Sequence, residues 1–171
     1  MDDPKIVTFQ TRHDEFLFVG VEQVVTSGSD FGTVWDNYFK TVEGSGFGEY
    51  EYVIWYYKNN AQIYFVGKIV DVADTVPEGF SLAKFPACEY LVVTHEWLTT
   101  DENLYLNGIL PTQNYVGIGQ THDYRENVPV PDGYVRYDGP DTPITQIEKE
   151  NSNTKDGSRF ERWVPIKKID G

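Results

Sequence analysis

The sequence predicts an α+β domain in which helices cover one face of an antiparallel sheet. Short apolar runs that alternate with polar residues recur along the 171 residues and are typical of half-buried strands. One segment, 31–42, repeats its apolar residues at helical spacing instead. The order strand, helix, hairpin then occurs a second time, about 70 residues further on. We therefore expect a single domain, 1–171, of two duplicated strand–helix–hairpin units that form the sheet and enclose a ligand pocket.

The first unit is expected to contain a strand, a helix and a hairpin, and no element is expected before residue 16. The helix should begin after an N-cap at Asp30 or Ser29 and end at Gly44 to Gly48. The two strands of the hairpin should be joined by a turn at 58–62. The predicted ranges of these elements are 16–25, 31–42, 50–57 and 63–72.

The second unit is expected to repeat this order after a turn at 76–79. Its long strand should bend at Pro86, and its weaker helix should begin at Asp101 and end before Pro111. We expect a long surface loop at 117–133 and a polar connection at 151–158 in the last hairpin. The predicted ranges of the elements are 82–96, 101–110, 144–150 and 160–169.

The formal net charge of −13 argues against partners that carry many negative charges. Nucleic acid and anionic membrane surfaces are bound mainly through Lys and Arg, of which the chain has 14 against 27 Asp and Glu. An acidic surface attracts cations, although it also serves solubility in general. We expect no direct nucleic-acid or membrane partner, and a cationic small molecule as ligand.

A single cysteine, Cys88, excludes an intrachain disulfide. It lies in the apolar run 85–93, where a buried, unreactive thiol is more typical than a nucleophile. The N-terminus shows no signal peptide, and no run approaches the roughly 20 apolar residues of a membrane span. We expect a cytoplasmic protein, and the sequence leaves its oligomeric state open.

The chain matches none of the common catalytic templates. The histidines, at positions 13, 95 and 122, have no metal-ligand spacing. Gly117-Ile118-Gly119 precedes no helix and is not a dinucleotide fingerprint, and no Gly-x-Ser-x-Gly elbow occurs. We therefore predict no metal, no cofactor and no catalytic residue, and favour a binding protein over an enzyme.

Aromatic residues make up 15% of the chain and suit a recognition surface, because they supply large apolar area at low rotamer entropy. A pocket for lipophilic cations needs aromatic walls and one unpaired carboxylate. Ordinary core packing is the alternative role of every aromatic residue. Trp55 and Tyr56 should point to opposite faces of one strand, so the face without helices needs a different partner. The candidate wall residues are Trp35, Phe39, Trp55, Tyr64, Tyr90, Trp97 and Trp163.

Six segments, in order and spacing, resemble the GyrI-like effector-binding domain, the drug-sensing module of AraC-type and MerR-type multidrug regulators. The likeness spans about Phe16 to Lys168. It includes a Val-Gly strand, a Val-Pro-Glu-Gly turn and a closing Glu-x-aromatic-x-Pro-Ile strand. The segments are Phe18–Val21, Tyr64–Val70, Val76–Phe80, Phe85–His95, Ile109–Tyr115 and Phe160–Lys168.

The resemblance implies a pocket glutamate near the last hairpin. Alignment with the family's penultimate strand selects Glu148, and Glu161 is the other candidate. Either could instead be a solvated strand residue, or an exposed partner of Arg159 or Lys149. The family's penultimate strand reads aromatic-Glu-x-Tyr, and Ile147–Glu150 lacks both aromatics. The loop 117–133 resembles an insertion.

Three functions fit these features. The leading expectation is a free-standing effector-binding module, because no helix-turn-helix is legible, and it would act through a partner. Some GyrI-like proteins hydrolyse electrophilic cyclopropane compounds, and there a pocket glutamate would activate water. An inhibitor that engages a basic protein partner through the acidic surface is the third alternative.

Overall fold

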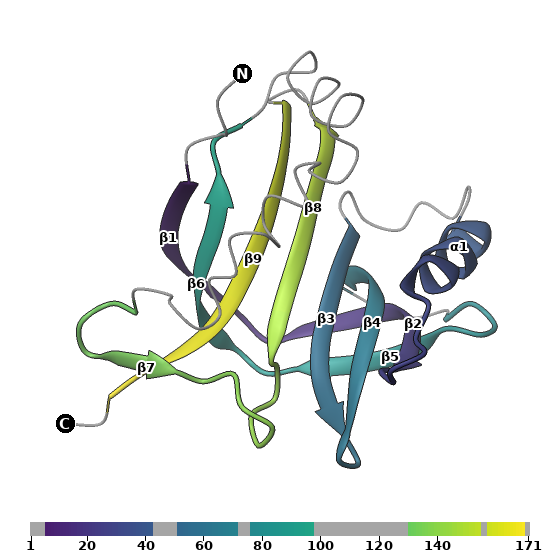
Figure 1. Cartoon of the computed structure of the whole chain (residues 1–171), viewed down its shortest axis with the longest axis horizontal. Coiled ribbons are helices and arrows are strands. Elements are labelled where there is room, and N and C mark those ends of the chain that lie inside the picture. The colour runs from purple at the N-terminus through teal and green to yellow at the C-terminus, as the bar shows by residue number, and fades with distance from the viewer. Residues whose placement is uncertain (1–5, 43–50, 72–75, 98–129, 155–156, 170–171) are drawn as a thin grey trace.

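The computed structural model describes residues 6–42, 51–71, 76–97, 130–154 and 157–169 (Figure 1). Within these ranges the chain forms one nine-stranded sheet and one helix. The elements are β1 (Ile6–His13), β2 (Phe16–Val24), α1 (Phe31–Val42), β3 (Glu51–Lys58), β4 (Ala61–Val70), β5 (Ser81–Phe85), β6 (Cys88–His95), β7 (Tyr134–Arg136), β8 (Gln146–Thr154) and β9 (Gly157–Lys168).

The strands are hydrogen-bonded in the order β1-β6-β9-β8-β3-β4-β2-β5, and β7 pairs with β9. All of these pairings are antiparallel. The predicted α+β class is therefore confirmed, with the sheet dominant. The helix predicted at 101–110 and most of the loop predicted at 117–133 lie outside the described residues.

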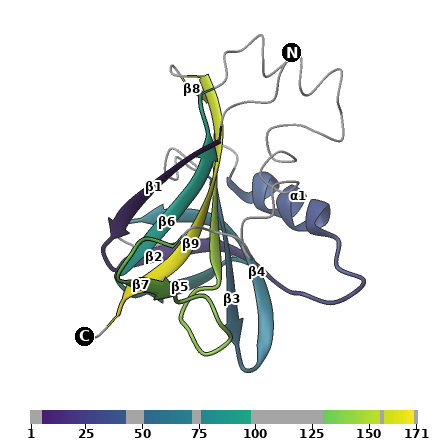
Figure 2. The ribbon, with the colours of Figure 1, turned by 60° about the vertical axis from the view of Figure 1, so that its left-hand side comes forward.

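One bent ribbon of two long strands connects the two sides of the sheet. β1 continues into β2, and β5 continues into β6 across the bend predicted at Pro86 (Figures 1 and 2). The partner pairs His13–Cys88 and Phe16–Phe85 keep one register across that bend. β1 overturns the expectation of no element before residue 16, since Val7-Thr8-Phe9-Gln10 alternates as a strand does.

The helix forms where the periodicity predicts it, and it lies on one face of the β2–β4 side of the sheet (Figures 1 and 2). Asp30 is the N-cap: its Oδ1 accepts the backbone N–H of Thr33 at 3.3 Å. Val34 and Tyr38 are buried against the sheet. At 12 residues, α1 is shorter than the roughly 20 needed to span a bilayer, and no other helix occurs in the described ranges.

Two hairpins differ from their predictions because polar residues continue the strands. In β3–β4 the turn is only Asn59-Asn60, with φ of 53° and 65°, rather than 58–62. In β8–β9 most of the predicted connection at 151–158 belongs to the strands, since Asn151 pairs with Arg159. Polar strand residues give no alternation of hydropathy. β7 was missed because three residues are too few to show a period.

The sheet buries two layers of side chains. On the α1 face, α1 packs on Val53, Tyr64 and Val66. We call the opposite face the core face. It carries the larger cluster of buried side chains, which includes Phe18 and Ile54. Trp55 and Tyr56 belong to these two different clusters, as the alternation in β3 predicts. The partner of the face without α1 is therefore the sheet's own aromatic residues, among them Phe16, Phe65 and Phe85.

A glycine pair allows β2 and β4 to approach closely at the centre of this layer. Gly20 and Gly67 lie opposite each other in the ladder. A Cβ atom on Gly20 would lie 1.9 Å from the carbonyl oxygen of Val66, and one on Gly67 would lie 2.1 Å from that of Val19. No side chain fits at either position without movement of the backbone.

Candidate functional site

The β8–β9 hairpin separates the two candidate glutamates onto opposite faces of the sheet. Glu148 lies opposite Arg162 and Val53, so it shares the α1 face. Glu161 lies opposite Lys149 and is followed two residues later by Trp163, which belongs to the core face. The aromatic candidates divide in the same way. Trp35, Phe39, Trp55 and Tyr64 lie on the α1 side, whereas Tyr90, Trp97 and Trp163 lie with Glu161.

The aromatic residues on the α1 side form one continuous cluster. The rings of Trp55 and Tyr64 meet edge to face at 4.9 Å between centroids. The Trp35 Nε1–H donates to the Tyr64 hydroxyl at 2.9 Å, and the Trp35 indole stacks on Phe39, whose side chain is half exposed. Phe31, the first residue of α1, stacks on Tyr64 at 4.3 Å. Its place in the helical stripe was predicted, but its place in this cluster was not.

Gln146 connects the aromatic cluster to Glu148. It lies directly opposite Trp55 in the β3–β8 ladder, and its side chain is buried. Its Nε2–H donates to Glu148 Oε1 at 2.9 Å. Gln146 and Glu148 are two residues apart, so the sequence contains this pair. Gln146 was not predicted as a site residue, because its place beside Trp55 depends on the pairing of β3 with β8. Trp55, Gln146 and Glu148 therefore form one row on the α1 face.

The indole nitrogen of Trp55 is a buried donor without an acceptor among the described residues. Buried polar groups are hydrogen-bonded in most proteins, and one without a partner disfavours the empty state. An occupant that accepts a hydrogen bond would satisfy this group. The row on the α1 face thus offers apolar rings, one donor and one carboxylate.

Neither glutamate is the unpaired carboxylate that the sequence-based hypothesis requires. Glu148 Oε1 lies 3.9 Å from an Arg162 Nη, and their side chains are 14% and 7% exposed. Glu161 Oε2 lies 3.3 Å from an Arg159 Nη, with 4% of the Glu161 side chain exposed. The hypothesis is wrong on this point because β9 places an arginine next to each carboxylate.

The aromatic residues around Glu161 already contact a cation of the chain itself, Arg159. Trp163 Nε1–H donates to Glu161 Oε1 at 3.1 Å. The Arg159 guanidinium lies 4.4 Å from the centroid of Trp97 and 5.8 Å from that of Phe9. Arg159 was foreseen as an exposed partner of Glu161, but Glu161 is buried and Arg159 is partly buried. Aromatic rings and a carboxylate here surround an internal cation.

Tyr90 is packed as a core residue. Its side chain is fully buried, and its ring lies 5.3 Å from that of Trp163. Burial, with a smaller contribution from the neighbouring Cys88, raises the pKa of the Tyr90 hydroxyl above its ordinary value. Burial likewise raises the pKa of the half-buried Cys88 thiol. In the described part of the chain, no group of three His, Cys, Asp or Glu side chains gathers as metal ligands do.

No family model and no curated protein sequence matches the chain. Similar solved structures do exist. An integron cassette protein from the mobile metagenome of Vibrio cholerae has a TM-score of 0.58 at 9% identity, over 97% of this chain and 100% of that one. The EcmrR C-terminal domain has 0.52 at 14% identity, over 96% and 99%. SAV2435, solved with bound tetraphenylphosphonium, has 0.53 at 9% identity, over 94% of each. The chain therefore shares the fold of these proteins over nearly its whole length.

Proposed function

We propose that this chain is a binding module for lipophilic cationic small molecules, with its site on the α1 face. The observation that carries the proposal is the row of Trp55, Gln146 and Glu148 beside the aromatic cluster of α1 and β4. Aromatic faces attract an organic cation with about 0.5 to 2 kcal/mol per contact. The carboxylate of Glu148 would supply the counter-charge.

Both glutamates pair with an arginine, and Glu148 is the better candidate because the arginine of Glu161 also covers the aromatic rings beside it. Arg159 occupies the aromatic and anionic surroundings of Glu161, and its ion pair is shorter than that of Glu148. A ligand at Glu161 would have to displace Arg159, whose guanidinium already lies over the rings of Trp97 and Phe9. At Glu148 a cation would compete with a longer contact, and Gln146 would still orient the carboxylate.

The fold supports this proposal as well. SAV2435 has the same fold and binds tetraphenylphosphonium, a lipophilic cation. EcmrR carries the fold in its C-terminal domain. We extend the proposal to an effector role, in which binding of the small molecule changes the interaction of this chain with a separate regulatory protein.

We also propose that the domain is a duplication. The strand order on one side, β3-β4-β2-β5, is repeated on the other as β8-β9-β6-β1. In the first unit α1 lies between β2 and β3 in the chain. The corresponding position in the second unit, between β6 and β8, contains the segment 101–110, which was predicted to be helical.

Fluorescence titration tests the proposed function directly. Tetraphenylphosphonium should quench the tryptophan emission at micromolar concentration, whereas tetraphenylborate, an anion of matched shape, should not. Trp55→Phe should remove most of the quenching while the remaining tryptophans report that the fold is intact. Equal binding of both ions would exclude the carboxylate. Tight binding of a protein with no affinity for small ions would favour the inhibitor alternative.

A further inference from the structure

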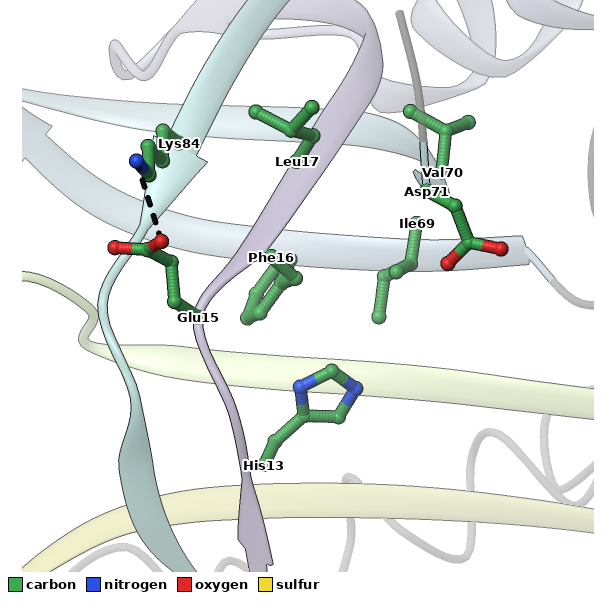
Figure 3. Close-up of a pocket in the computed structure, with 8 residues that line it drawn as sticks. All are labelled: His13, Glu15, Phe16, Leu17, Ile69, Val70, Asp71 and Lys84. Atoms are coloured by element: carbon green, nitrogen blue, oxygen red, sulfur yellow. Dashed lines mark ion pairs between the residues drawn. The ribbon is translucent and has the colours of Figure 1, made fainter.

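A cavity of about 320 Å³ lies at the bend between β1 and β2 and beside the end of β4 (Figure 3). Its volume is in the range of small-molecule sites. Its lining includes neither candidate glutamate and none of the candidate wall residues. It is lined by His13, Glu15, Phe16, Leu17, Ile69, Val70, Asp71 and Lys84.

The apolar part of the cavity is formed by Phe16 and Ile69, which lie side by side in Figure 3. Phe16 is buried, and its ring contacts Phe85 in the core. The Glu15–Lys84 ion pair lies on one side of Phe16, and Asp71 lies on the other side, beyond Ile69. The cavity is thus apolar at its centre and charged at both ends.

His13 presents a hydrogen-bond acceptor to this cavity in its neutral form. Its Nδ1 lies 2.7 Å from the backbone carbonyl oxygen of Asp14. A carbonyl oxygen only accepts, so Nδ1 carries the proton and Nε2 has the lone pair. The imidazole also meets Phe16 edge to face at 4.9 Å, which holds the ring in place.

Asp71 provides the negative charge at its end of the cavity. It has no hydrogen bond or ion pair to any other residue in the described ranges, and it is exposed. At the opposite end Glu15 lies 3.2 Å from Lys84, which offsets its charge. The accessible polar groups at the Asp71 end are therefore acceptors, and a complementary ligand must donate hydrogen bonds and carry positive charge.

We propose that this cavity binds a small aliphatic ammonium ion. The ammonium group faces Asp71 and donates to His13 Nε2, and the alkyl chain lies on Phe16 and Ile69. The site differs from the proposed one on the α1 face, which requires aromatic walls for a bulky cation. An alkyl chain of about four carbons would fit the short apolar floor.

NMR titration of the full chain with n-butylammonium tests this inference. Amide signals around His13, Phe16 and Asp71 should shift with one common dissociation constant, and equimolar butyrate should cause no such shifts. Asp71→Asn removes the charge from an exposed side chain and should weaken n-butylammonium binding about tenfold. His13→Phe keeps the aromatic contact with Phe16, removes the acceptor and should weaken binding severalfold.

Asp132→Asn is the matched control, because it removes the same charge from an exposed residue outside the cavity. Its affinity for n-butylammonium should equal that of the original chain. Shifts that do not saturate, or an Asp71→Asn variant with unchanged affinity, would overturn the inference. Glu148→Gln should leave n-butylammonium binding unchanged, so the second site and the proposed function can fail separately.

Discussion

Glu148 and Arg162 face each other across the β8–β9 ladder, and the nearest oxygen and nitrogen of their side chains lie 3.9 Å apart. This distance is at the outer limit of an ion pair, and both side chains are largely buried. Gln146 holds the carboxylate by a shorter contact of 2.9 Å. Glu148 is therefore oriented by a buried amide and paired with a buried arginine, so a cationic ligand must compete with Arg162 for its carboxylate.

Glu148→Gln should weaken tetraphenylphosphonium binding by about 1.5 to 3 kcal/mol, because a charge-assisted contact becomes a neutral one. Neutral ligands of the same shape should bind as well as before. Isothermal titration calorimetry with a charged and an uncharged ligand measures both effects. Glu161→Gln is the matched control: it should lower the free energy of unfolding, since Arg159 loses its buried partner, with little change in affinity. A charge-selective loss in Glu161→Gln alone would move the site to the core face.

Gly20→Ala should destabilise the protein severely. The new Cβ would lie 1.9 Å from the Val66 carbonyl oxygen, so β2 and β4 would have to move apart. We expect a loss of more than about 3 kcal/mol in the free energy of unfolding, measured with urea. Gly139→Ala is the control, since a Cβ there meets no atom within 4 Å. Equal stability of the two variants would contradict the close approach of the strands.

Tyr56→Phe should make the protein less sensitive to alkali. Burial, and then the hydrogen bond from Tyr56 to Glu22 and the charge of Glu22, raise the pKa of the Tyr56 hydroxyl above its ordinary 10.0. The native state therefore keeps a proton that the unfolded chain loses, and stability falls as the pH rises above 10. The free energy of unfolding, measured with urea at pH 9 and at pH 11, should fall less steeply with pH in the variant, by up to about 1.4 kcal/mol per pH unit. Tyr90→Phe should act in the same direction, because burial also raises the pKa of the Tyr90 hydroxyl. If the free energy of unfolding depended on pH in both variants as it does in the original chain, this prediction would be wrong.

Cys88 should react slowly with thiol reagents in the native state. Burial raises the pKa of its thiol, so less thiolate is present at pH 8 than in an exposed cysteine. Its reaction with 5,5′-dithiobis(2-nitrobenzoate) should accelerate greatly in urea. A fast reaction in the native protein would indicate an activated nucleophile and would reopen the enzyme alternative.

Periodicity predicts well the elements that have one apolar face. Helix α1 begins and ends as its stripe predicts, from Phe31 to Val42, and its cap is one of the two proposed residues, Asp30. The bend at Pro86 was also predicted, because proline cannot continue the ladder. The polar ends of β8 and β9 were missed, since their pairing partners, not their own hydropathy, make them strands. β1 was missed although its residues 7–10 alternate between apolar and polar.

The site was only half predictable. Glu148 and Glu161 lie on different strands, so both their faces and their neighbours follow from how β8 and β9 pair. Gln146 meets Trp55 only through the β3–β8 ladder. The pair of Glu148 and Arg162 was missed for the same reason, because it spans two strands. The cavity at Asp71 joins segments more than fifty residues apart in the chain, which no local pattern reports.

The bent ribbon predicts that the molecule unfolds as a single cooperative unit, because it links the strands of the two sides of the sheet. β1 pairs with β6 from the other side of the sheet, and β5 pairs with β2. A fragment ending after β4 would leave β1 and β2 with unpaired edges, which promote self-association. Fragments 1–75 and 76–171 should therefore fold only when mixed, and the slowest amide hydrogen exchange should occur in both halves at one common rate.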